Sequence, residues 1–166
     1  MTGRIVEDEA YPQRDPAAHH FRGPTPRTKS MFLQRGHAYV YFSYGNHFML
    51  NVSAELEGTG GGVLIRALEP LEGMELMQRN RETTRVLDLA RGPGRLAEAL
   101  QIDRSLDGVN LCAPGPLWLG KVERAPKGEL TIARSPRIGI TRAAKRLLRF
   151  YERGSLFVSG AAKLRR

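Results

Sequence analysis

The feature that most constrains this chain is a stretch of aromatic and branched residues with one turn signal at its centre. Residues 37–53 are rich in Tyr, Phe and Val, and Gly45-Asn46 is typical of a tight reverse turn. This pattern predicts a β-hairpin, and therefore an antiparallel sheet. The other predicted strands and helices do not alternate regularly, which favours an α+β fold over a doubly wound parallel sheet.

The register of this hairpin decides which side chains face one another. Tyr39 and Tyr41 share one face of their strand, because side chains alternate between the two faces. A two-residue loop places Tyr41 opposite Leu50, whereas a three-residue loop, 45–47, places it opposite Asn51. The aromatic strand packs in a core or forms a wall on which another ring stacks.

The rest of the chain predicts short elements separated by Gly and Pro. We expect a helix over 71–89, a second helix over 95–100 and a helical turn over 143–146. Short strands are expected at 4–6, 62–67, 117–121, 130–133 and 137–140. A length of 166 residues is typical of one domain, and we expect residues 1–166 to form a single domain.

Composition excludes several classes of protein. Apolar runs such as 48–50 are too short to span a bilayer, and the N-terminus lacks the apolar core of a signal peptide. The single cysteine, Cys112, excludes an intrachain disulfide. We therefore expect a cytoplasmic protein with no membrane partner.

Basic residues are concentrated at one end of the chain. Residues 1–133 hold 16 basic and 16 acidic side chains, whereas residues 134–166 hold ten basic side chains and one acidic one. Of the 26 basic residues 21 are arginine, which binds phosphate in a bidentate manner that lysine cannot match. This distribution favours a nucleic acid as the partner, the alternative being a solvated surface rich in arginine.

Three consecutive acids, Glu7-Asp8-Glu9, follow the first predicted strand. Glu7 and Glu9 point to the same side of a strand, where two carboxylates can serve as an acid/base pair or bind a metal. The alternative is a solvated strand end. The four histidines and Cys112 show no spacing typical of metal ligands, so we expect no metal site.

Ten short motifs in order resemble those of the alkyladenine (3-methyladenine) DNA glycosylase family along essentially the whole chain. They include Gly-Arg-Ile-Val-Glu-Asp-Glu-Ala-Tyr (3–11), Arg-Gly-Pro-Thr-Pro-Arg (22–27), Tyr-Val-Tyr-Phe-Ser-Tyr-Gly (39–45), Leu-Ile-Arg-Ala-Leu-Glu-Pro (64–70) and Pro-Arg-Ile-Gly-Ile (136–140). The resemblance implies a curved antiparallel sheet with a protruding β-hairpin and surrounding helices. The chain begins almost inside the first motif, so its N-terminus is short relative to the family.

The resemblance also implies roles for individual residues. Glu9 matches the general base that deprotonates the attacking water, and Arg66 matches a polar residue beside that water. Tyr11, His19, Tyr41 and Asn51 match the pocket that holds the flipped base, and the pairing of Tyr41 with Asn51 favours the three-residue loop. Tyr44 matches the wedge that fills the gap in the base stack. Phosphate contacts are expected from Arg22, Arg27, Arg95, Arg137, Arg142, Lys145 and Arg146.

The function that the resemblance implies is excision of alkylated or deaminated purines from double-stranded DNA. The enzyme would flip the nucleotide out of the duplex and hydrolyse its N-glycosidic bond, leaving an abasic site without strand cleavage. We expect a monofunctional, monomeric enzyme without cofactor, associated with the bacterial nucleoid. The alternatives are a non-catalytic nucleic-acid binding module of the same fold, and a metal-dependent nuclease.

Overall fold

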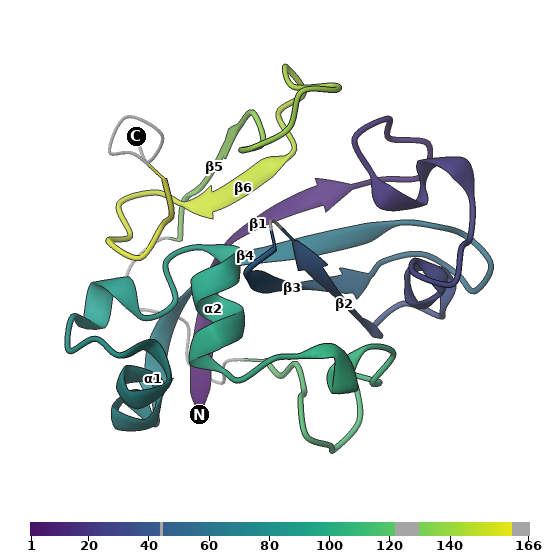
Figure 1. The fold of residues 1–166 in the computed structure, drawn as a ribbon. Coiled ribbons are helices and arrows are strands. Elements are labelled where there is room, and N and C mark those ends of the chain that lie inside the picture. Colours follow the sequence, from purple (N-terminus) through teal and green to yellow (C-terminus); the bar gives the residue numbers. More distant parts are fainter. Residues whose placement is uncertain (44, 122–129, 161–166) are drawn as a thin grey trace.

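The computed structural model describes residues 1–43, 45–121 and 130–160, and at its centre lies a six-stranded antiparallel sheet (Figure 1). In the order in which they lie in the sheet, the strands are β2 (Ala38–Ser43), β3 (His47–Ser53), β4 (Gly62–Glu72), β1 (Thr2–Tyr11), β6 (Arg149–Glu152) and β5 (Ile132–Ser135). The described ranges hold two α-helices, α1 (Met74–Arg81) and α2 (Pro93–Ala99). The sheet is curved and does not close into a barrel, which confirms the α+β prediction.

Strand β1 lies inside the sheet, because it is hydrogen-bonded to β4 on one side and to β6 on the other. The acids at its end are therefore not solvated: the side chains of Glu7 and Glu9 are fully buried. The ladder between β1 and β4 shifts register between Glu7 and Asp8, and this shift leaves Arg66 without a Cα partner. Such irregularities re-aim side chains, and here the Arg66 guanidinium reaches both Glu7 and Glu9.

The hairpin of β2 and β3 has two different faces. Val40 and Leu50 pack with Leu96 of α2 in the main hydrophobic core, whereas the odd-numbered side chains point to the opposite face. Leu96 and Ala97 of α2 are completely or almost completely buried in this core. The hairpin is thus supported from behind by the helix.

The structure confirms the hairpin but corrects its register. Ser43 is paired with His47 at the end of the ladder. Both predicted registers are therefore wrong: Tyr41 lies opposite Met49, and it is Tyr39 that lies opposite Asn51. Tyr44 itself lies outside the described residues.

Several other predicted elements are wrong. The helix expected over 71–89 is confined to α1, because β4 continues to Glu72 and because Gly73 and Glu82, at positive φ, bound the helix. Residues 117–121 and 137–140 form no strand. The strand expected at 130–133 begins and ends two residues later, at Ile132–Ser135. The segment 143–146 forms turns rather than a helix, since Ala143 takes a φ of 49°.

The contact between α2 and the hairpin gives a first prediction. Leu96 is completely buried in the core, so Leu96→Ala should lower the free energy of unfolding by about 2–5 kcal/mol. Urea denaturation measures this loss. Glu98→Ala, on the exposed side of the same helix, should change stability by less than about 1 kcal/mol. Equal effects of the two changes would contradict the packing described for α2.

Candidate functional site

The hairpin face that points away from α2 forms one wall of an aromatic cavity of about 310 Å³. The other walls come from the end of β1, the loop that holds the 3-10 helix His19–Arg22, the middle of β4 and the segment 138–140. The lining combines aromatic rings with a few polar groups: Tyr11, Ala17, Ala18, His19, His20, Met31, Tyr39, Tyr41, Ser43, Met49, Asn51, Leu64, Arg66, Pro93, Ile138, Gly139 and Ile140. Its volume is at the lower end of the range for small-molecule sites and suits one planar ring system.

Three rings of the lining are locked together. The Tyr41 ring stacks on Tyr39 at a centroid distance of 5.3 Å, and His19 meets Tyr41 edge-on at 4.5 Å. The His19 Nδ1 atom lies 3.1 Å from the Tyr39 hydroxyl. Partial burial lowers the pKa of His19, and the positive charge of Arg27 lowers this pKa further, so the imidazole is neutral at pH 7.

The carboxylate of Glu9 lies one hydrogen bond behind the cavity wall. Its Oε1 accepts from the Ile138 backbone N–H at 2.7 Å and lies 3.2 Å from Arg66 Nη1, and its Oε2 accepts from the Tyr11 hydroxyl at 3.0 Å. All three of these neighbours line the cavity. Burial and the charge of Glu9 raise the pKa of Tyr11, so its hydroxyl stays protonated and remains a donor.

Glu7 holds Arg66 in place from the other side. Its Oε1 accepts from Arg66 Nε at 3.0 Å, from Arg149 Nε at 2.7 Å and from the Ser159 hydroxyl at 2.9 Å. Burial alone would raise the pKa of Glu7, but the two guanidiniums and the Ser159 backbone N–H reverse this effect and lower it. Glu7 is thus a structural anion that fixes Arg66 between two carboxylates.

Asn51 brings an amide into the cavity without a protein partner. The residue is buried and lines the cavity, and within the described ranges its Nδ2 atom has no hydrogen-bond acceptor. A buried donor of this kind costs free energy in the empty protein. It is available to an acceptor on a bound ring.

Most of the residues that the sequence predicts for the site are brought together. The cavity and the carboxylate behind it gather Glu9, Tyr11, His19, Tyr41, Asn51 and Arg66. Tyr39 also belongs to the cavity but is absent from the predicted pocket; its position two residues before Tyr41 is the signal that places both rings on one face. The backbone N–H of Ile138 is a further contact to Glu9 that no side-chain pattern shows.

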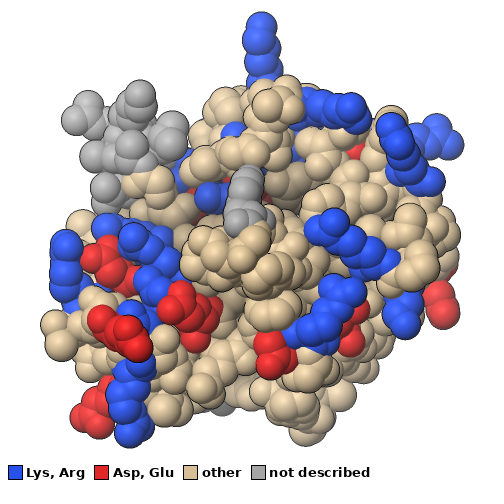
Figure 2. Space-filling view, viewed as in Figure 1, with Lys and Arg blue, Asp and Glu red and all other residues tan. Residues whose placement is uncertain are grey.

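The residues expected to contact phosphate differ in exposure. The side chains on the surface are Arg22, Arg27, Arg95, Arg142, Lys145 and Arg146. Two of these already have carboxylate partners: Arg95 pairs with Asp88, and Arg146 with Asp15. Figure 2 shows basic side chains spread over one face, with acidic side chains beside many of those in its lower half.

Arg137 does not fit this expectation. Its side chain is fully buried and pairs with Asp15 at 2.9 Å, so the structure places it inside the protein rather than on a surface that could meet a phosphate. The burial of this side chain thus argues against the expected phosphate contact. A count of charges along the chain cannot distinguish a buried arginine from an exposed one.

The described residues also give evidence on metal binding and on membrane insertion. No group of three or more His, Cys, Asp or Glu side chains there could hold a metal ion. No helix within these ranges is long and apolar enough to cross a membrane.

Comparison with known proteins gives the class of the chain: it is a DNA glycosylase, an enzyme of DNA repair. The family model described as "Methylpurine-DNA glycosylase (MPG)" matches residues 1–156. The chain belongs to the methylpurine-DNA glycosylase family.

Individual relatives agree with this assignment. A protein of Mesorhizobium japonicum is 65% identical over 164 residues, which cover 99% of this chain and 77% of the relative. Proteins of Paraburkholderia phytofirmans and Granulibacter bethesdensis are 51% and 50% identical, over 99% and 98% of this chain and 76% of each relative. All three carry the name "Putative 3-methyladenine DNA glycosylase".

The charge cluster behind the cavity gives a second prediction. Glu7→Gln leaves two buried guanidiniums without their shared carboxylate, which should lower the free energy of unfolding at pH 7 by about 3–5 kcal/mol. Because the folded-state pKa of Glu7 lies below the unfolded value of 4.5, its contribution is present above that value and is lost as the pH falls through the folded-state pKa. Urea denaturation at pH 7 and near pH 3 should therefore show a large difference from the wild type that shrinks in acid.

Glu69→Gln is the matched control for this change. Glu69 pairs with Arg4 at the protein surface, where its side chain is 31% exposed. This variant should lose less than about 1 kcal/mol at pH 7. A Glu7→Gln variant as stable as this control would refute the role given to Glu7.

Proposed function

We propose that the protein takes a damaged purine out of duplex DNA into the aromatic cavity and hydrolyses its N-glycosidic bond with a water that Glu9 deprotonates. The observation that carries this proposal is the place of Glu9: a buried carboxylate one hydrogen bond behind the wall of a cavity that suits a single base. The family supports damaged DNA as the substrate, and the names of the relatives support 3-methyladenine as one excised base.

The rings of the cavity would bind the flipped base by stacking. Tyr41 and Tyr11 present π-faces, which attract the positive charge that alkylation places on a purine. The Asn51 amide at the wall would admit an acceptor but disfavour the exocyclic 2-amino group of undamaged guanine, because two donors cannot pair. Selectivity for damaged purines would thus depend on the positive charge of the alkylated base and on the Asn51 amide.

Hydrolysis would need one proton transfer at Glu9. A water attacks the sugar C1′, a C1′–O bond forms, and the C1′–N bond breaks with its electron pair leaving on the purine. A carboxylate offers about four acceptor positions, and Glu9 receives three donors, so one position remains for this water. Arg66, which contacts Glu9 and lines the cavity, would hold the same water.

The product would be an abasic site without strand cleavage. Strand cleavage by a glycosylase requires an amine nucleophile, and none of the described residues that line the cavity is a lysine. We propose a monofunctional enzyme that acts as a monomer without a cofactor or metal. Tyr44, outside the described residues, would fill the gap that the flipped nucleotide leaves.

Replacement of Glu9 gives the third prediction. Glu9→Gln should bind damaged duplex as the wild type does but release the base at least about 10²-fold more slowly, the usual contribution of a general base. Single-turnover release from duplexes carrying 3-methyladenine, 7-methylguanine, hypoxanthine or ethenoadenine measures the rate. Glu57→Gln, an exposed acid away from the cavity, should keep the wild-type rate.

The same assay separates the other classes of function. A non-catalytic DNA-binding module would release none of the four bases, and a metal-dependent nuclease would lose its activity in EDTA. Base release that persists in EDTA and falls in Glu9→Gln supports the proposal. Wild-type turnover in Glu9→Gln would refute the role of Glu9.

The exposed basic residues that follow the cavity-lining segment 138–140 give the fourth prediction. Each neutralised phosphate contributes about −0.9 to the slope of log K against log salt. Replacing Arg142 and Lys145 together by Gln should flatten this slope by up to about 1.8 and weaken damaged and undamaged duplex alike. Fluorescence anisotropy at several salt concentrations measures both affinities; an unchanged slope would place these side chains away from DNA.

A further inference from the structure

Arg137 is a buried arginine that joins three segments of the chain behind the cavity. It lies at the start of the segment that supplies Ile138 to the cavity lining, and its side chain is completely covered. Its Nη1 donates to the backbone carbonyl of Ala10 at 2.9 Å, and its Nη2 lies 2.9 Å from Asp15 Oδ2. The three segments are the end of β1, the loop before the 3-10 helix His19–Arg22, and residues 136–140.

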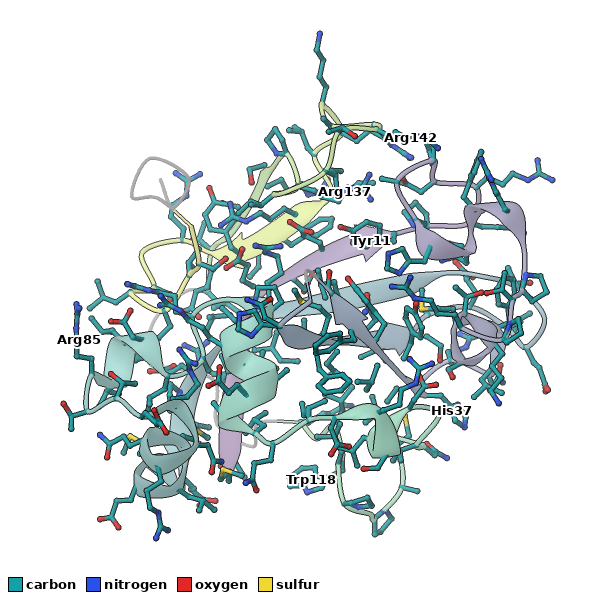
Figure 3. All side chains as sticks on the ribbon, viewed as in Figure 1. Tyr11, His37, Arg85, Trp118, Arg137 and Arg142 are labelled. Atoms are coloured by element: carbon teal, nitrogen blue, oxygen red, sulfur yellow. The ribbon has the colours of Figure 1, made fainter. Side chains whose placement is uncertain are left out.

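The same guanidinium supports the ring of Tyr11. Its central carbon lies 4.4 Å from the centroid of the Tyr11 ring, a cation–π distance, and Figure 3 shows the two side chains next to each other at the end of β1. Tyr11 lines the cavity and Arg137 does not. The arginine therefore touches the cavity only through a side chain that forms its wall.

Arg137 is also connected to Glu9 through neighbouring residues of the chain. Ala10, whose carbonyl it holds, lies between Glu9 and Tyr11 in β1, and the next residue, Ile138, donates its N–H to Glu9 at 2.7 Å. A guanidinium offers a rigid set of donors, so two fixed hydrogen bonds define its orientation and that of both segments. A lysine at this position could supply the charge but not this fork.

Asp15 completes the arrangement on the far side. Its side chain is also fully buried, and its Oδ1 accepts from the Ala17 backbone N–H at 2.8 Å, which shapes the loop that leads to His19. Its Oδ2 has a second, half-exposed partner, Arg146, at 3.1 Å. One buried ion pair thus connects both the Tyr11 side and the His19 side of the cavity.

We propose that Arg137 is a positioning residue for base excision: it holds the Tyr11 ring and the Ile138 backbone where the flipped base and Glu9 need them, and it does not bind DNA. This inference rests on the proposed function of the cavity. It assigns to Arg137 a role in the chemical step rather than in the affinity for the phosphate backbone. A displacement of about 1 Å in such a constellation costs about 10²-fold in rate.

The test separates the rate of base release from the affinity for DNA. Arg137→Gln should release the base about 10- to 10²-fold more slowly in single turnover, while its affinity for undamaged duplex and the salt slope of that affinity stay at wild-type values. Arg137→Lys should restore less than half of the lost activation free energy, since it keeps the charge without the fork. If Arg137 acted only through its positive charge, Arg137→Lys would release the base at the wild-type rate.

Arg134→Gln is the matched control. Arg134 lies on the neighbouring strand β5, is exposed and also covers an aromatic ring, that of Phe150, at 5.3 Å, but it does not line the cavity. Its replacement removes the same charge and a similar contact, and it should leave the rate of base release unchanged. A fall in rate equal to that of Arg137→Gln would overturn the proposal.

The other outcomes are also decisive. A flatter salt slope in Arg137→Gln would make the residue a phosphate contact, and an unchanged rate would exclude positioning. If Arg137→Gln does not fold, as thermal unfolding would show, Arg137→Lys alone carries the test: a wild-type rate in this variant overturns the proposal. If the wild-type protein releases none of the four bases, the proposed function fails and the inference about Arg137 fails with it, whereas a failure of the inference alone leaves wild-type base release intact.

Discussion

The cavity depends on a cluster of buried charges at the centre of the sheet. Two carboxylates and two guanidiniums, those of Glu7, Glu9, Arg66 and Arg149, balance one another where almost no solvent reaches. Buried ions are tolerated only when their geometry is good and their remaining hydrogen bonds are satisfied. The two carboxylates meet this condition because they belong to β1, which is hydrogen-bonded to a strand on each side. This ladder holds both carboxylates on one face. The proposed general base, Glu9, is thus fixed by the same interactions that stabilise the strand.

In the proposed function, the group that reacts is separate from the groups that recognise the base. The hairpin supplies rings and an amide to the cavity, and it is supported by α2 on its other face. The carboxylate comes from a different strand and reaches the cavity only through Tyr11, Arg66 and a backbone N–H. Substitutions in the hairpin can therefore alter which ring is accepted without moving Glu9. This division is typical of sites whose chemistry is common to many substrates.

The sequence predicted which side chains share a face of the hairpin better than it predicted their cross-strand partners. A strand has a period of two residues, so a register shifted by two keeps Tyr41 and Asn51 on one face although their cross-strand partners change. This is why Tyr41 and Asn51 both line the cavity although the predicted register of the hairpin is wrong. The role of Arg137 could not be predicted in this way, because Asp15 lies far away in the sequence and only the folded chain brings the two together. The same holds for Glu7, whose partners Arg149 and Ser159 come from the last described segment.

The place of β1 in the sheet also has a consequence for the order in which the protein can be assembled. Among the described strands β1 is synthesised first and β6 last, and β1 is bonded both to β4 and to β6. Contacts between such distant segments form slowly, because long loops must close first. Until Arg149 arrives, Glu7 has no buried cation on that side, and the two acids of the nascent strand remain in water. The proposed catalytic centre is therefore completed only once β6 has been synthesised, so a chain that stalls or is truncated before β6 would expose β1 as an unpaired edge.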